Sequence, residues 1–92
     1  MNIGQVVIWT KQNCSYCTRT KNALRSKNIP FEEMILDRDF TREILLEAYP
    51  TAKTFPVIVI DGYYIGGFEQ LEQKLNEETN DKRRLLNEII TL

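Results

Sequence analysis

The first half of the chain alternates short apolar runs with longer mixed segments. Gln5–Thr10 is a short apolar run rich in β-branched residues, a pattern that favours a buried strand, and Phe31–Asp37 is predicted as a second strand. Between them, Ser15–Lys27 predicts a helix, and Asn28-Ile29-Pro30 ends it because a proline disfavours helical conformation in the residue before it. Two strands joined by a helix of this length predict a parallel βαβ unit with a right-handed crossover.

The second half predicts a helix, a hairpin and two further helices. Thr41–Tyr49 places apolar residues on one helical face and is stopped by a proline. Asp61-Gly62 is a hairpin turn signal that joins a strand over Val57–Asp61 to an antiparallel strand over Tyr63–Ile65. Gly66-Gly67 ends that strand, and helices are predicted over residues 68–78 and about 81–91.

These elements define a fold of the α/β class. A chain of 92 residues has room for one hydrophobic core, so we expect a single domain over residues 1–92. Residues 3–78 form its core, and the helix over about 81–91 is an addition to it. The order βαβαββα predicts a four-stranded mixed sheet flanked by helices. A domain of this size buries only about 60–65% of its unfolded surface, so a large ligand must bind on the outside.

Charge is distributed unevenly, although the net charge is only −1. Residues 1–31 contain five basic residues and no acidic one, whereas the remainder carries seven basic and thirteen acidic residues. We assign Arg19, Lys21, Arg25 and Lys27 to the solvated face of a helix. Lys11 lies close to Cys14 and is the better candidate for a functional cation. The pI of about 5.4 and the lack of a long basic run argue against a nucleic-acid partner.

The chain has two cysteines, three positions apart, and no histidine. The N-terminus lacks the basic start and apolar core of a signal peptide, and no stretch is apolar for long enough to span a membrane. We therefore expect a cytoplasmic protein without a membrane partner. In such a reducing compartment, a close cysteine pair is more often catalytic or metal-binding than structural.

Cys14 and Cys17 lie at the start of a predicted helix, directly after a strand. Unpaired N–H groups and the helix dipole favour a thiolate at Cys14, and the thiolate is the attacking species in thiol–disulfide exchange. Cys17 lies one turn further on the same face and can displace a substrate from Cys14, provided that Cys14 is the more exposed. A zinc site and a cysteine protease are disfavoured because histidine is absent. Two ordinary core cysteines remain the alternative.

Three segments together resemble the glutaredoxin family, over roughly residues 3–78. Lys11 precedes Cys14-Ser15-Tyr16-Cys17, which is similar to a dithiol glutaredoxin active site. Lys53-Thr54-Phe55-Pro56-Val57 is similar to the segment that contains the family's cis-proline. Ile65-Gly66-Gly67-Phe68-Glu69-Gln70-Leu71 is similar to the glycine-pair segment that grips glutathione. Their joint occurrence in this order is specific, whereas each motif alone is weak.

The resemblance implies a thioredoxin-like fold and a monomeric, glutathione-dependent oxidoreductase with Cys14 and Cys17 as catalytic residues. Glutathione would be the reducing cosubstrate, no metal would be needed, and the substrates would be disulfide-containing or glutathionylated proteins. The N–H groups of Phe68 and Glu69 would then hold the γ-glutamyl carboxylate. The implied glutathione-binding residues are Lys11, Tyr16, Lys53, Phe55, Pro56, Gly67, Phe68, Glu69 and Gln70.

Each of these residues has an implied task. Lys11 and Lys53 would meet the glycine carboxylate of glutathione, and Glu69 with Gln70 its ammonium group. The backbone of Phe55, presented by a cis Pro56, would pair with the cysteine part of glutathione as an added strand does. Tyr16 would line the groove for the thiol.

Three positions depart from the family's usual pattern and keep two alternatives open. Ser15 replaces a proline, Phe55 a valine, and Gln70 a second acid. Some members with a serine at this place assemble an iron–sulfur cluster between two chains and two glutathiones, so an iron–sulfur scaffold or carrier is one alternative. Other small redoxins of this kind are reduced by thioredoxin reductase and serve ribonucleotide reductase, which is the second.

Overall fold

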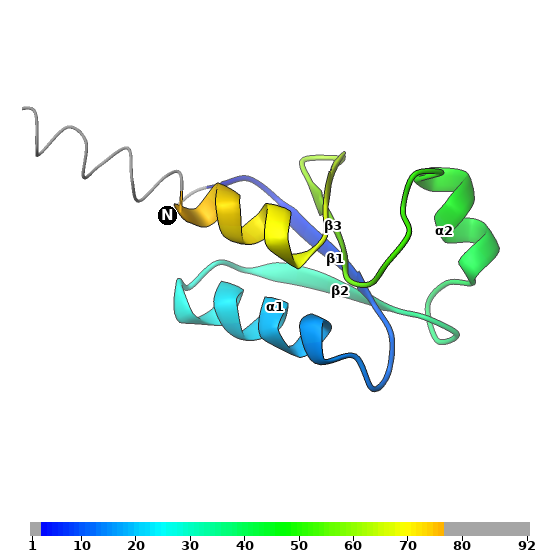
Figure 1. Ribbon diagram of the computed structural model, residues 1–92, viewed down its shortest axis with the longest axis horizontal. Coiled ribbons are helices and arrows are strands. Elements are labelled where there is room, and N and C mark those ends of the chain that lie inside the picture. Colours follow the sequence, from blue (N-terminus) through cyan, green and yellow to red (C-terminus); the bar gives the residue numbers. More distant parts are fainter. Residues whose placement is uncertain (1–2, 77–92) are drawn as a thin grey trace, which may run out of the picture.

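The structure of the protein is a computed structural model, which describes residues 3–76 (Figure 1). The helix predicted over about 81–91 lies outside the described residues. Of the elements described, the helices are α1 (Ser15–Ser26), α2 (Arg42–Ala48) and a helical segment over 68–76. The strands are β1 (Val6–Thr10), β2 (Phe31–Ile35), β3 (Val57–Ile60) and β4 (Tyr63–Gly66). None of the helices in the described part of the chain has the length and apolar character needed to cross a bilayer.

The four strands form one mixed sheet in the order β2-β1-β3-β4. β1 pairs with β2 in parallel, and β3 pairs antiparallel with both β1 and β4. The hairpin between β3 and β4 turns at Asp61 and Gly62, whose φ angles of 53° and 85° are the positive values that a tight two-residue hairpin requires. The predicted element order and mixed sheet are therefore confirmed.

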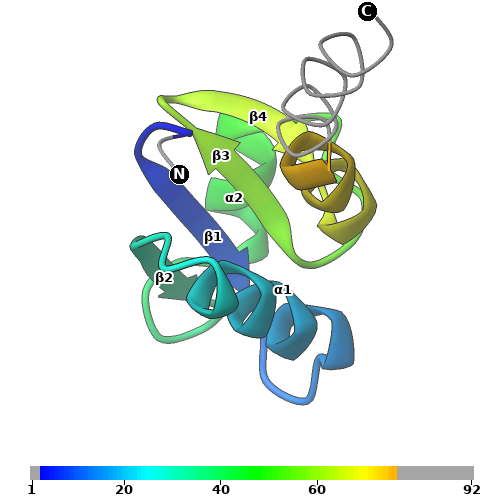
Figure 2. The same cartoon turned by 90° about the vertical axis from the view of Figure 1, so that its left-hand side faces the viewer.

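Alternation along β1 divides the core into two layers, one on each face of the sheet. Val6 and Ile8 pack in one layer with residues of α1 and of the helix over 68–76. Val7 and Trp9 face the other layer, which contains Leu45 of α2. This is the period of two expected of a strand that is buried on both faces. Figure 2 shows the consequence, with α1 and the helix over 68–76 on one side of the sheet and α2 on the other.

The strand expected over Phe31–Asp37 ends two residues early, at Ile35. Asp37 adopts a left-handed φ of 67°, which a continuing strand does not accommodate. The carboxylate of Asp39 accepts a hydrogen bond from the amide of Ile35 at 2.8 Å and so provides a side-chain partner at the end of the strand. A short turn therefore replaces the last part of the predicted strand.

Candidate functional site

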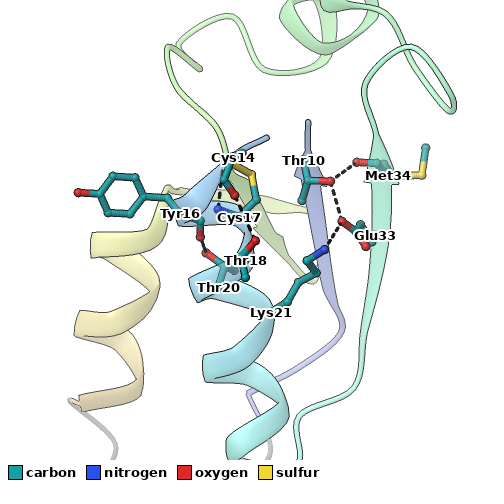
Figure 3. Close-up of a disulfide and its surroundings, with 9 residues drawn as sticks. All are labelled: Thr10, Cys14, Tyr16, Cys17, Thr18, Thr20, Lys21, Glu33 and Met34. Carbon is teal, nitrogen blue, oxygen red and sulfur yellow. Dashed lines mark hydrogen bonds and ion pairs between the residues drawn. A yellow bond between two sulfur atoms is a disulfide. The ribbon is translucent and has the colours of Figure 1, made fainter. Parts of the chain in front are cut away.

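The two cysteines form a disulfide at the first turn of α1 (Figure 3). Cys14 is the N-cap residue, with extended φ and ψ angles of −117° and 106°. Its Sγ atom accepts a hydrogen bond from the amide of Cys17 at 3.2 Å, so the sulfur lies where the helix presents its unpaired N–H groups. The side chain of Cys17 is buried, with 2% of its surface exposed, whereas Cys14 is partly exposed. This is the asymmetry that a nucleophile and a resolving thiol require.

A hollow of about 540 Å³ lies against this disulfide, and we call it the cysteine hollow. It is lined by Thr10, Lys11, Gln12, Asn13, Cys14, Ser15, Cys17, Thr18, Lys21, Glu33 and Ile35. Its residues come from the end of β1, the following loop, α1 and β2. Because β1 and β2 are parallel, their carboxyl ends meet at the same edge of the sheet, next to the start of α1.

A chain of polar contacts crosses the cysteine hollow. The hydroxyl of Thr10, a residue with only 1% of its surface exposed, donates to Oε2 of Glu33 at 2.7 Å. The same oxygen lies 3.2 Å from Nζ of Lys21. Partial burial raises the pKa of Glu33, but the hydrogen bond from Thr10 and the Lys21 cation outweigh it, so this pKa lies below its ordinary value.

Lys21 does not belong to the solvated face to which the sequence assigns it. It is four residues after Cys17 in α1, and residues spaced in this way share a helix face. Glu33 is not among the residues predicted from the sequence, although the alternation of side chains along β2 indicates its direction. Glu32 and Glu33 are consecutive in β2, so only one of them can point toward α1.

A second hollow, of about 350 Å³, brings together seven of the nine expected glutathione-binding residues; we call it the groove. It is lined by Tyr16, Thr54, Phe55, Pro56, Gly67, Phe68, Glu69 and Gln70. The Phe55–Pro56 peptide bond is cis, as the resemblance implies. Thr54 is an addition to the expected set, and its signal is its place between two expected residues, Lys53 and Phe55.

The glycine pair and Gln70 form the start of the helix over 68–76. Gly66 has a φ of 122°, and a Cβ atom on it would lie 2.7 Å from Cγ of Gln70. The amide of Gly67 donates to Oε1 of Gln70 at 2.9 Å. This is one of the two hydrogen bonds of a capping box, in which the third helical residue accepts from the backbone N–H of the N-cap residue. The amide oxygen of Gln70 therefore already has a partner in the fold. Its role toward the ammonium group of glutathione stays a prediction, and Gln70 does line the groove.

The two expected lysines lie outside the groove. Nζ of Lys11 is 5.8 Å from the centroid of the Phe55 ring, at the boundary between groove and cysteine hollow. Lys53 is exposed and lines a different hollow beside α2. Arg42 also stacks on the Phe55 ring, with its guanidinium carbon 5.7 Å from the centroid. Sequence reasoning missed Arg42, since nothing in its pattern distinguishes it from a solvated first-turn residue.

Comparison with known proteins places this fold and cysteine pair in one family. The sequence model of the glutaredoxin family matches residues 6–65. Glutaredoxin 3 of Escherichia coli (strain K12) is 35% identical over 69 residues, which cover 75% of this chain and 83% of the relative. The hybrid peroxiredoxin hyPrx5 of Haemophilus influenzae is 37% identical over 68 residues, which cover 74% of this chain but only 28% of that longer protein.

A solved structure agrees with these relatives. The buckwheat glutaredoxin–glutathione complex superposes with a TM-score of 0.70 and 25% sequence identity, covering 84% of this chain and 73% of the buckwheat chain. The four-stranded mixed sheet with its helices is thus the thioredoxin-like fold that the resemblance implies. Family and fold together support thiol–disulfide oxidoreductase chemistry. The chain belongs to the glutaredoxin family.

Proposed function

We propose that the protein is a glutathione-dependent dithiol oxidoreductase that reduces protein disulfides and glutathione mixed disulfides. The observation that carries the proposal is the asymmetry of the cysteine pair, in which Cys14 is accessible at a helix start and Cys17 is buried one turn further on. Tyr16, between the two cysteines in sequence, lines the groove, and this supports a substrate that reaches Cys14 from that side.

With a glutathionylated protein, the Cys14 thiolate attacks the sulfur of the glutathione moiety. A Cys14–glutathione disulfide forms, and the protein thiolate leaves and takes a proton from solvent. A second glutathione, as its thiolate, attacks this mixed disulfide, releases oxidised glutathione and restores the Cys14 thiolate. Only Cys14 is needed in this sequence.

With a protein disulfide, Cys14 forms a mixed disulfide with one substrate sulfur and the other substrate sulfur leaves as a thiolate. Cys17 loses its proton and attacks Cys14, which frees the second substrate thiolate and forms the Cys14–Cys17 disulfide. Two glutathiones then supply two electrons and two protons to reopen it, and leave as oxidised glutathione. Burial of Cys17 fits this role because it keeps external disulfides away from the resolving thiol.

Recognition of glutathione is supported by the groove. Phe55 and Pro56 form one wall, and the helix that starts at Phe68 forms the other. The amides of Phe68 and Glu69 lie in the first turn of that helix, where backbone N–H groups and the dipole favour a carboxylate. The buckwheat relative, whose structure contains glutathione, has the same fold.

The decisive experiment compares Cys14→Ser and Cys17→Ser on two substrates, a glutathionylated peptide and a protein disulfide, each with glutathione and glutathione reductase. We expect Cys14→Ser to be inactive on both and Cys17→Ser to retain activity on the glutathionylated peptide only. Activity of Cys14→Ser would contradict the assignment of the nucleophile.

Two control reactions test the alternatives. Efficient turnover with thioredoxin reductase in the absence of glutathione, on a model disulfide or on ribonucleotide reductase, would overturn glutathione dependence. Anaerobic reconstitution with iron, sulfide and glutathione, followed by absorbance and size-exclusion measurements, tests the carrier alternative motivated by Ser15. A coloured dimer would favour an iron–sulfur carrier over the reductase.

A further inference from the structure

The polar chain of Thr10, Glu33 and Lys21 adjoins the disulfide on the side opposite to Tyr16 (Figure 3). Glu33 is the one acidic residue among those described that line the cysteine hollow, and it shares that hollow with two cations, Lys11 and Lys21. The contact is not an open surface pair, because the side chains of Lys21 and Glu33 are only 25% and 22% exposed.

Lys21 and Glu33 act on the sulfur atoms with opposite sign. A cation in the cysteine hollow stabilises a cysteine thiolate, and an anion there destabilises it. The hydroxyl of Thr10 and the ammonium of Lys21 both contact Oε2 of Glu33, so the carboxylate is held in one place by two donors. The pKa of Glu33 is lowered by Thr10, Lys21 and, least, Arg38, so the carboxylate is ionised at neutral pH.

We propose that Glu33 is a positioning residue that compensates the charge of Lys21 beside the cysteine pair and so limits how far the dithiol form is favoured over the disulfide. The disulfide is uncharged, whereas the dithiol form gives up a proton to become a thiolate. Charges in the hollow therefore act mainly on the reduced state, and a stabilised reduced state means a more oxidising pair. The proposal rests on thiol–disulfide exchange alone and requires no role for glutathione.

The test measures the equilibrium between the protein and 2-mercaptoethanol with its disulfide. Two molecules of 2-mercaptoethanol lose two electrons and two protons as they join in one disulfide, and the Cys14–Cys17 bond opens to two thiols. In some of the reduced molecules, one of the two cysteine thiols has released its proton to solvent and is a thiolate. This reagent contains no glutathione, and its thiol and its disulfide are both neutral. Because the measurement is made at equilibrium, the rate at which its thiolate attacks does not enter.

The central comparison is Glu33→Gln against Glu32→Gln. Both substitutions remove one negative charge from β2, but Glu32 is exposed and its side chain alternates to the other face. We expect the equilibrium constant for reduction to rise about fivefold in Glu33→Gln, which is a shift of about 20 mV in potential, and to change by less than about twofold in Glu32→Gln. Equal values in the two variants would overturn the proposal.

A second variant keeps the test independent of any loss of fold in Glu33→Gln. Lys21→Gln, on the helix, leaves the Glu33 charge uncompensated, and we expect it to lower the equilibrium constant by a similar factor. The double variant should return to within about twofold of the parent. Shifts of the two single variants in the same direction, or no shift in Lys21→Gln, would also overturn it. Because glutathione is absent, these outcomes do not depend on the glutathione assay above.

Discussion

Gln70 accepts the amide proton of Gly67 at 2.9 Å and so closes the first turn of the helix over 68–76. The family's common second acid is replaced here by an amide, but the amide makes the same backward contact that a glutamate makes in a capping box. Gln70, which the resemblance assigns to glutathione, thus lines the groove and also caps the helix that borders it.

Replacing Gln70 should test its structural role, and a glutamate at this position should test the effect of adding a charge. We expect Gln70→Ala to lower the free energy of unfolding by about 0.5–1 kcal/mol, because the amide of Gly67 loses its partner. Gln70→Glu should keep the parent stability, since glutamate caps equally well and its charge suits the helix start. Urea denaturation of the three proteins checks this, and equal stability of parent and Gln70→Ala would count against the cap.

The two adjacent glycines should respond differently to alanine. Gly66 has a φ of 122° and would bring a Cβ atom 2.7 Å from Gln70, so we expect Gly66→Ala to cost about 1–3 kcal/mol. Gly67→Ala should cost less, because the nearest atom to its Cβ would be the carbonyl oxygen of Pro56, at 3.4 Å.

Thermal unfolding of both variants, with and without Gln70→Ala, measures these costs. The penalty at Gly66 should shrink in the Gln70→Ala background, where the crowding side chain is shortened, but it should not vanish because the backbone strain stays. A larger cost at Gly67 than at Gly66 would contradict this account of the pair.

The capping role of Cys14 predicts a difference between two variants at the proposed nucleophile. Serine is among the preferred N-cap residues and alanine is not, so under reducing conditions Cys14→Ser should be more stable than Cys14→Ala by about 1 kcal/mol. Urea unfolding in excess reductant gives the value. The contact from the amide of Cys17 would be energetically unimportant if the two variants unfolded together.

The lowered pKa of Glu33 predicts how stability depends on pH. Its ordinary value is 4.5; burial raises it, but the Thr10 hydrogen bond and the Lys21 cation bring it lower in the folded protein. The stabilisation is therefore fully present above about pH 4.5 and is lost as the pH falls through the folded value. Glu33→Gln should be less stable than the parent at neutral pH, and the difference should shrink below about pH 4.5. A difference that stays constant from pH 7 to 3 would rule this out.

The sequence predicts the elements well because their signals are local. β1 alternates between two buried faces, Pro30 and Pro50 follow helix ends, and Asp61-Gly62 specifies a hairpin. The early end of β2 was not predictable from periodicity, since it depends on the left-handed Asp37 and on the contact from Asp39 to Ile35. Side-chain hydrogen bonds of this kind become visible only in the folded chain.

The candidate site likewise contains residues that the sequence predicts and residues that it does not. Residues within a recognised motif, such as Phe55 and Gly67, come together as expected. Glu33 and Arg42 carry no motif and reach their positions only through the register of β2 and the start of α2. Lys21 is assigned to the solvated face because it lies in a series of basic residues. Its partner, Glu33, lies on another element and cannot be identified from the sequence.

The groove and the cysteine hollow have no lining residue in common within residues 3–76, although they meet at the turn that holds both cysteines. The groove is built from residues 54–56 and 67–70 with Tyr16, whereas the hollow is built from the ends of β1 and β2 and the first turns of α1. If the two proposals above hold, ligand selectivity and electron affinity depend on largely separate sets of residues, with Lys11 at the boundary between them. Substitutions that avoid Lys11 should then change one property with little effect on the other.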